Sequence, residues 1–223
     1  MRFAVIVFPG TWSDHDCQYC LRDVLGQEAD LVWHRQSDLS RYDCLVLPGG
    51  FSYGDYLRAG AIARFSPVME AVDRFAADGG PVLGICNGFQ VLCEAGLLPG
   101  ALLPNDGLKF VCRQVELVVE NVDSIWTSAC EQGERLSIPV KHTTGRYFAP
   151  EELLERLEAA GQVALRYAPG ENPNGSLNDI AGVRNEPGNV IGLMPHPEHA
   201  VDELTGSVDG LKLFESAARL VAA

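Results

Sequence analysis

Hydrophobic residues in the first hundred positions fall into short continuous runs that alternate with segments of helical periodicity. After Ser13 and after Ser66, apolar side chains recur every three or four positions, and serine often begins a helix. Strands that alternate with helices favour a mainly parallel sheet, wound by right-handed crossovers. We therefore expect an α/β fold with buried strands at residues 1–8, 29–33, 44–47 and 82–85.

The pattern changes after residue 110. Four apolar residues then fall on one parity of a run bounded by polar residues, which is typical of a strand in an antiparallel sheet; they are Val111, Val115, Leu117 and Val119. We also expect strands at residues 124–128, 163–167, 180–184 and 190–194, and helices at 150–160 and about 208–221. The second half thus adds a small antiparallel part to the wound sheet. Because no repeat or linker interrupts the chain, we predict a single domain over residues 1–223.

The most informative stretch is residues 81–96, where a short apolar strand breaks at Cys86 and a helical pattern follows as far as Gly96. Gly84-Ile85-Cys86-Asn87-Gly88 is a cysteine version of the nucleophile elbow, a tight strand-to-helix turn that presents a nucleophile. The N-terminus of the following helix favours a thiolate over a thiol. A buried structural cysteine is the alternative interpretation. The flanking glycines, which permit the sharp bend, favour the nucleophile.

A second candidate group follows the expected strand that ends at Met194. His196 can accept the proton of a thiol nucleophile, and Glu198 can orient the imidazole and stabilise its cationic form. A metal site formed by His196, Glu198 and His199 is an alternative, but no third cluster at a strand end completes it. We therefore expect no metal. Paired with the cysteine elbow in a wound sheet, the histidine and the glutamate predict a catalytic triad.

Another strand runs directly into Gly49 and Gly50, and paired glycines at a strand end allow backbone N–H groups to face a ligand. A plain turn is the simpler interpretation, whereas an oxyanion-binding loop fits a nearby nucleophile. Glycine motifs that bind nucleotide phosphates do not occur in the chain. A cysteine, a histidine and an oxyanion loop are suited to acyl transfer at an amide or ester carbonyl. These residues alone do not identify the carbonyl.

Composition limits the partners and the compartment. The formal charge of −13 with no basic cluster argues against nucleic acid, and no apolar run approaches the roughly 20 residues of a membrane helix, which argues against a membrane partner. Seven cysteines, an odd number without a small-scaffold pattern, suit the reducing cytoplasm. Cys17 and Cys20 could form a redox or zinc pair, with His15 and His34 as extra ligands. Their helical spacing with Leu21 favours a core face instead.

Two of these motifs resemble the class I glutamine amidotransferases. Their elbow, G-x-C-x-G-x-Q, corresponds to residues 84–90, and their H-P-E segment corresponds to residues 196–198. More narrowly, the chain is similar to the glutaminase subunits of phosphoribosylformylglycinamidine synthases. That similarity is carried by residues 49–60, 145–148, 172–176 and 194–198, and it extends over nearly the whole chain.

The resemblance implies a flavodoxin-like domain that hydrolyses L-glutamine to glutamate and ammonia. It assigns Cys86 as the nucleophile, His196 as the base and acid, and Glu198 as the residue that orients it. The backbone amides of Gly50 and Asn87 would bind the oxyanion. Gln90 would help to place the substrate.

The same resemblance implies three subunits in small-subunit forms of the enzyme. Ammonia would pass to a large synthetase subunit, which makes formylglycinamidine ribonucleotide, and a small third subunit would bridge the two. No cofactor is expected in this chain, because ATP and magnesium would be used by the synthetase.

The chain departs from the family pattern at two places. His199 stands where an arginine is usual, and the segment from Lys141 to Gly145 differs from the usual H-G-E-G run. Two other classes remain as alternatives. Protease-like and deglycase-like proteins share the wound fold and the cysteine elbow, but they usually place a histidine where Asn87 follows Cys86. A catalytically inactive regulatory subunit would be expected to lack a triad member, and none is missing.

Overall fold

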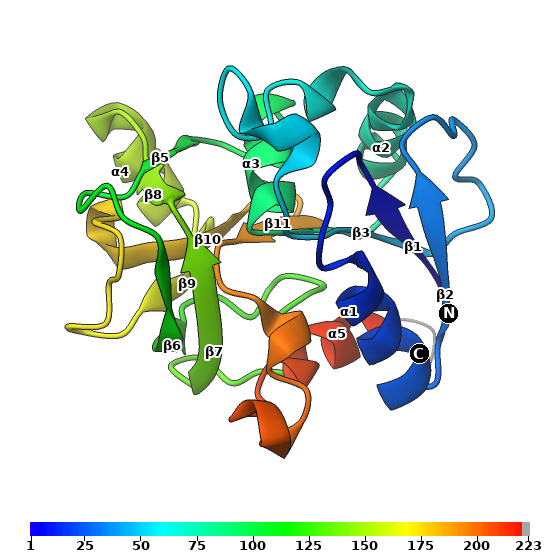
Figure 1. Cartoon of the computed structure of the whole chain (residues 1–223). Coiled ribbons are helices and arrows are strands. Elements are labelled where there is room, and N and C mark those ends of the chain that lie inside the picture. The colour runs from blue at the N-terminus through cyan, green and yellow to red at the C-terminus, as the bar shows by residue number, and fades with distance from the viewer. Residues whose placement is uncertain (220–223) are drawn as a thin grey trace.

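A nine-stranded sheet, with the order β2-β1-β3-β4-β11-β10-β9-β6-β7, forms the centre of the computed structural model, which describes residues 1–219 (Figure 1). Five strands on one side are parallel and follow the flavodoxin-like order. They are β2 (Glu28–Trp33), β1 (Arg2–Val7), β3 (Cys44–Leu47), β4 (Val82–Ile85) and β11 (Val190–Leu193). The expected α/β fold with a wound, mainly parallel sheet is confirmed.

The antiparallel addition expected in the second half is also present. Each remaining strand of the large sheet runs antiparallel to its neighbours. These strands are β10 (Ile180–Arg184), β9 (Val163–Tyr167), β6 (Val111–Val119) and β7 (Arg135–His142). A separate two-stranded antiparallel sheet pairs β5 (Ala101–Pro104) with β8 (Thr144–Phe148). The pattern of apolar residues predicted neither of these two strands, nor β7.

Helices cover both faces of the large sheet. Figure 1 shows α1 and α5 on one side of the parallel strands and α2 and α3 on the other. The helices are α1 (Asp14–Tyr19), which continues into a π-helical turn (Cys20–Val24), α2 (Pro67–Ala77), α3 (Asn87–Glu94), α4 (Glu151–Ala159) and α5 (Leu211–Ala218). Cys17 of α1 and Cys20 of the π-helical turn are completely buried, so their interpretation as core residues is confirmed. No helix in the described part of the chain is both long and apolar enough to cross a membrane.

The two halves of the sheet are buried differently. Every residue of β3 and of β4 is buried, as expected for parallel strands covered on both faces. In β7 the buried residues alternate, which leaves the other face toward solvent. Pro139 interrupts no ladder there, because β7 is an edge strand.

The strand expected at residues 124–128 is wrong. This segment forms consecutive turns, in which the Thr127 amide donates to the Ser124 carbonyl oxygen at 3.1 Å. Trp126 is completely buried, and its indole N–H donates to the carbonyl oxygen of Asn189 at 3.3 Å. A short apolar segment anchored by one large side chain can therefore meet its burial requirement without a strand partner. The last expected helix begins later than predicted, at Leu211, and its positions 220–221 lie outside the described residues.

Candidate active site

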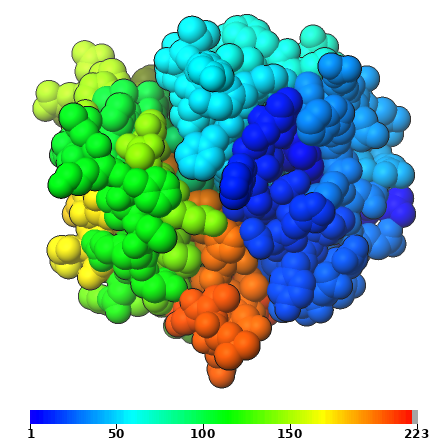
Figure 2. Space-filling view, in the orientation of Figure 1, coloured from blue at the N-terminus to red at the C-terminus, as the bar shows by residue number. Residues whose placement is uncertain are grey.

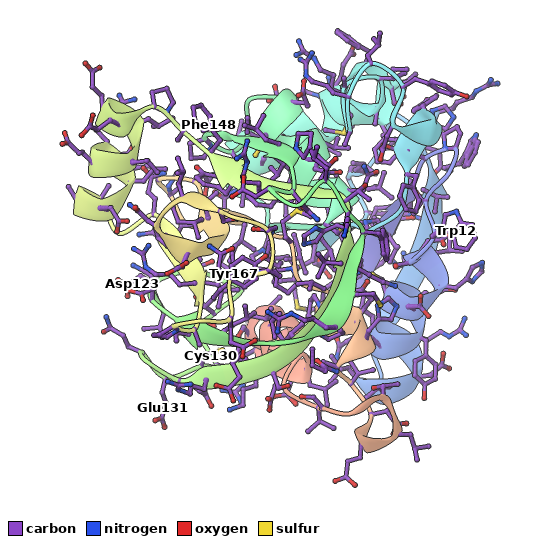
Figure 3. All side chains as sticks on the ribbon, turned by 60° about the vertical axis from the view of Figure 1, so that its left-hand side comes forward. Trp12, Asp123, Cys130, Glu131, Phe148 and Tyr167 are labelled. Atoms are coloured by element: carbon purple, nitrogen blue, oxygen red, sulfur yellow. The ribbon has the colours of Figure 1, made fainter. Side chains whose placement is uncertain are left out.

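A pocket of about 220 Å³ opens at the carboxyl ends of the parallel strands. Cys86 reaches it from the end of β4, His196 from the segment after β11, and Gly50 from the loop after β3. Trp12, which follows β1, also lines the pocket, and its side chain lies at the edge of the molecule in Figure 3. Figure 2 shows the corresponding blue, cyan, green and orange segments converging on one face of the molecule. Strand ends of a wound sheet therefore gather groups that are far apart in the sequence.

Cys86 has the strained backbone of a nucleophile elbow. Its φ and ψ angles are 50° and −102°, and a positive φ is uncommon for a residue other than glycine. Its backbone N–H donates to the carbonyl oxygen of Leu193 at 2.8 Å, which ties the turn to β11. Gly88 allows the helix to pack this closely, because a β-carbon there would overlap the carbonyl oxygen of Leu47. The elbow predicted from the sequence is present.

The resting state of the thiol differs from the expectation. Burial and, to a smaller extent, the nearby Glu198 carboxylate raise the pKa of Cys86 to about 12, although the N–H of Asn87 and the charge of Lys141 act in the opposite direction. The helix N-terminus therefore does not produce a thiolate in this environment, because the cost of desolvating the anion is larger. A nucleophilic attack by this sulfur would therefore require a base that takes the thiol proton.

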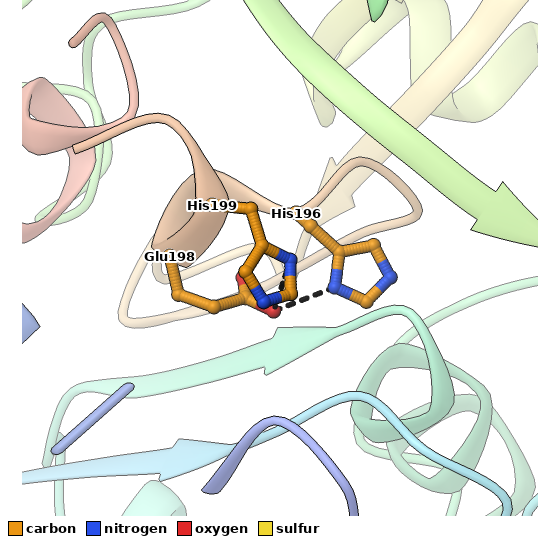
Figure 4. Close-up of side chains that lie close together, drawn as sticks. All are labelled: His196, Glu198 and His199. Atoms are coloured by element: carbon orange, nitrogen blue, oxygen red, sulfur yellow. Dashed lines mark hydrogen bonds and ion pairs between the residues drawn. The ribbon is translucent and has the colours of Figure 1, made fainter. Parts of the chain in front are cut away.

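His196 and Glu198 are joined by a buried hydrogen bond, with His196 Nδ1 and Glu198 Oε1 2.6 Å apart (Figure 4). Burial by itself raises the pKa of Glu198, but the charge and the hydrogen bond of His196, with a contribution from His199, hold it below its usual range. An ionised carboxylate only accepts hydrogen bonds, so Nδ1 carries a proton, and in the neutral ring Nε2 keeps its lone pair. His196 Nε2 has no hydrogen-bond partner among residues 1–219. The ring therefore has the orientation and the unpartnered nitrogen that a general base requires.

Gly49 lies between the histidine and the cysteine. A β-carbon at Gly49 would be 2.5 Å from His196 Cε1 and 3.5 Å from Cys86 Cβ. Both side chains also line the same pocket. The fold thus brings together two residues that are separated by 110 positions in the sequence, and it requires the smallest residue between them.

The amides expected to bind an oxyanion are available. Within the described chain, the Gly50 N–H donates no hydrogen bond, and the Asn87 N–H faces the Cys86 sulfur, whose pKa it lowers. Gly50 has a φ of 149°, and a β-carbon there would be 2.7 Å from the carbonyl oxygen of Gly10 and 2.7 Å from the amide nitrogen of Trp12. Only glycine fits this close approach of two loops. The two amides are donors of the kind that stabilise a tetrahedral oxyanion.

Gln90 lines the pocket, as expected, but its amide is used within the protein. Its Nε2 donates to the carbonyl oxygen of Thr144 at 2.5 Å, and its Oε1 accepts from Asn87 Nδ2 at 2.8 Å. The side chain of Asn87 makes two further hydrogen bonds: its Oδ1 accepts from the backbone N–H of Ser52, and its Nδ2 donates to Asp55 Oδ1. Burial raises the pKa of Asp55 to about 6, against a smaller lowering by Asn87. These side chains fasten the loop after β3 to the elbow and to β8.

Several pocket residues were not predicted from the sequence. Trp12, Ser13, Phe51 and Asp55 come from the loops after β1 and β3, and the others come from the antiparallel half: Phe110, Lys141, His142, Thr143 and Thr144. Only the departure of residues 141–145 from the family pattern drew attention to this turn. Spacing gives no signal here, because which turn covers a strand end is decided by the packing of β7 and β8.

The alternative of a metal site can be examined directly. One ligand atom from each of His196, Glu198 and His199 lies within 4.8 Å of the others, and no other such group occurs in residues 1–219. His196 Nδ1 and Glu198 Oε1 already form the 2.6 Å hydrogen bond that orients His196. A metal bound by these two atoms would replace that hydrogen bond, so such a metal and the triad exclude each other.

Known proteins resemble this chain in sequence and in fold. The model of a family, the CobB/CobQ-like glutamine amidotransferase domain, matches residues 1–219. A chain of the structure of PurLQS from Thermotoga maritima is 45% identical, with 99% of this chain and 98% of that chain covered and a TM-score of 0.90.

More distant structures share the fold alone. One is a protein from Thermoplasma acidophilum described as a GMP synthase subunit, with 18% identity, 100% and 94% of the two chains covered, and a TM-score of 0.66. Another is a glutamine amidotransferase from Thermotoga maritima, with 16% identity, 98% and 90% covered, and a TM-score of 0.56. The resemblance seen in the sequence is confirmed: the chain belongs to the CobB/CobQ-like glutamine amidotransferase family.

Proposed function

We propose that this chain is the glutaminase subunit of a phosphoribosylformylglycinamidine synthase, with residues 1–223 forming a single class I glutamine amidotransferase domain. The chemistry is supported by the convergence of the Cys86 elbow and the hydrogen-bonded pair His196 and Glu198 on one pocket. The narrower assignment is supported by the motifs of residues 49–60 and by the 45% identity with the PurLQS chain.

In the first half of the reaction, Cys86 Sγ attacks the side-chain amide carbon of L-glutamine. His196 Nε2 takes the thiol proton as the sulfur–carbon bond forms, because the high pKa of Cys86 leaves little free thiolate. The amides of Gly50 and Asn87 hold the negative oxygen. His196 then donates the proton to the leaving nitrogen, the carbon–nitrogen bond breaks, and ammonia and a glutamyl thioester remain.

In the second half, water attacks the thioester while His196 accepts one of its protons. The carbon–sulfur bond breaks, glutamate leaves, and Cys86 recovers its proton from His196. Glu198 stays ionised throughout and stabilises the imidazolium that forms twice in each cycle. Gln90 acts by holding the pocket wall at Thr144, and through it the substrate.

The ammonia is delivered to a large synthetase subunit, which uses ATP and magnesium to make formylglycinamidine ribonucleotide, and a small third subunit bridges the two. This chain itself carries no cofactor and acts in the cytoplasm. Neither nucleic acid nor a membrane is a partner.

The test is Cys86→Ala in the complex with the synthetase and the small subunit. We expect glutamine-dependent synthesis to fall by at least about 10³-fold. Synthesis from added ammonium salt should continue at the wild-type rate, because free ammonia bypasses the missing half-reaction. Equal loss of both activities would show that the cysteine does not serve glutamine hydrolysis in particular.

A further inference from the structure

His199 occupies an unusual position beside the catalytic imidazole. Its ring stacks on that of His196, with centroids 5.3 Å apart and an angle of 26° between the planes (Figure 4). His199 Nδ1 lies 3.6 Å from Glu198 Oε1, the same oxygen that contacts His196. One carboxylate oxygen is thus shared by two stacked imidazoles.

The other nitrogen of His199 faces one hydrogen-bond acceptor and one hydrogen-bond donor. His199 Nε2 lies 3.0 Å from Asp16 Oδ2 on α1 and 3.3 Å from Lys141 Nζ on β7. The Asp16 carboxylate can only accept a hydrogen bond, whereas the Lys141 ammonium can only donate one. A neutral ring with its proton on Nδ1 accepts from Lys141. A cationic ring donates to Asp16 and repels Lys141. A neutral ring with its proton on Nε2 also donates to Asp16, but it carries no charge that repels Lys141. A proton on Nε2 therefore decides which of the two contacts is made, and only the cationic ring places a positive charge beside His196.

We propose that His199 is a positioning residue that acts through His196: its charge sets how readily the stacked catalytic imidazole accepts a proton. This inference rests on the proposed function, in which His196 becomes an imidazolium when it takes the proton of Cys86. A neutral His199 leaves Glu198 to stabilise that cation. A cationic His199 places a second positive charge against the same face, which disfavours the imidazolium of His196.

The charged groups around His199 are few. Asp16 faces it from α1, Lys141 from β7, and Glu198 and His196 from its own segment. Helix α5 also packs near this segment, but its Lys212 pairs with Glu134 and its Glu215 with Arg219. Helix α1 adds the thiols of Cys17 and Cys20, and burial raises the pKa of both well above the usual range, so they stay neutral.

The experiment compares His199→Asn, which is neutral at every pH, with His199→Arg, which is always cationic. The pH dependence of kcat/KM for glutamine hydrolysis is measured in the complex, with a chelator present so that no metal binds the histidines. We expect the acid limb of His199→Arg to lie about one pH unit below that of His199→Asn, because a neighbouring cation disfavours protonation of His196. His15→Asn removes an exposed imidazole next to Asp16 and should leave the profile unchanged.

A merely structural role would lower the activity of both variants without separating their acid limbs. Coincident limbs, or limbs in the reverse order, would overturn the proposal. Should a variant not fold, NMR titration of the wild-type rings decides the question, because coupled imidazoles show a shared second inflection and independent ones do not. Cys86→Ala distinguishes the two proposals: if that variant still hydrolyses glutamine, the proposed function fails, whereas the ring titrations test the coupling separately.

Discussion

His196 and His142 are both buried, and both line the same pocket, but they come from different halves of the sheet. His196 follows the parallel strand β11, contacts the carboxylate of Glu198, and has an Nε2 without a partner in residues 1–219. His142 ends the antiparallel strand β7. Its Nδ1 lies 3.1 Å from Asn105 Oδ1, and its Nε2 lies 3.4 Å from Asn174 Nδ2.

The partners separate the roles of the two rings. A carboxylate stabilises a cationic imidazole, whereas two amides fix one neutral tautomer and occupy both nitrogens. Burial and the like charge of His196 lower the pKa of His142 to about 4, so this ring stays neutral at the pH of the cell. The parallel half of the molecule therefore holds the ring that we propose as the catalytic base. The antiparallel half holds a ring that fixes the pocket wall.

The largest test of this comparison exchanges each histidine for asparagine. We expect His196→Asn to lower kcat for glutamine hydrolysis by at least about 10³-fold, because no group then takes the thiol proton. His142→Asn should lower kcat by less than about tenfold and change KM more, since it loosens the wall at Thr143 and Thr144. Steady-state kinetics of the two variants measures both effects. Comparable losses of kcat would show that the two rings share the chemistry.

A smaller effect should follow from moving His196 without removing it. In Gly49→Ala, the added β-carbon would be 2.5 Å from His196 Cε1, so the ring must shift away from Cys86. We expect kcat to fall by about 100-fold, as is typical when a catalytic group is misplaced by about an ångström. Gly107→Ala is the matched control, because a β-carbon there meets no atom within 4 Å. Wild-type turnover by Gly49→Ala would mean that the ring is not confined as described.

The smallest effect is on the pH dependence of the free energy of unfolding, and it depends on His142 alone. The pKa of this ring falls from 6.5 to about 4 on folding. Between these two pH values the ring is protonated in the unfolded chain and neutral in the folded protein. The stability that the neutral His142 ring contributes to the folded protein is fully present above pH 6.5 and is lost as the pH falls toward 4. The slope is about 1.4 kcal/mol per pH unit, or about 3 kcal/mol in all.

Chemical denaturation at several pH values measures this dependence. The free energy of unfolding of His142→Asn should change less steeply between pH 6.5 and about pH 4 than that of the wild type. Parallel curves would show that the ring is protonated in the folded protein, in conflict with its two amide partners.

Much of the fold and the core of the site could be predicted from the sequence because their determinants are local. Continuous apolar runs predicted β3 and β4 at their observed bounds, and two glycines around Cys86 predicted the strained elbow. The H-P-E segment places the histidine and glutamate two residues apart, within reach of each other in any extended backbone. Local sequence patterns were therefore sufficient to predict the candidate nucleophile, the candidate base and the residue that orients the base.

Only the tertiary structure decided what depends on contacts between distant segments. The turns of residues 124–128 replaced an expected strand because Trp126 is anchored by Asn189, 63 positions away. The neutral thiol of Cys86 reflects desolvation by the whole surrounding core, which outweighs the local effect of one helix N-terminus. The closure of the pocket by the turn between β7 and β8, and the contacts of His199 with α1 and β7, likewise arise only when the two halves of the sheet are joined.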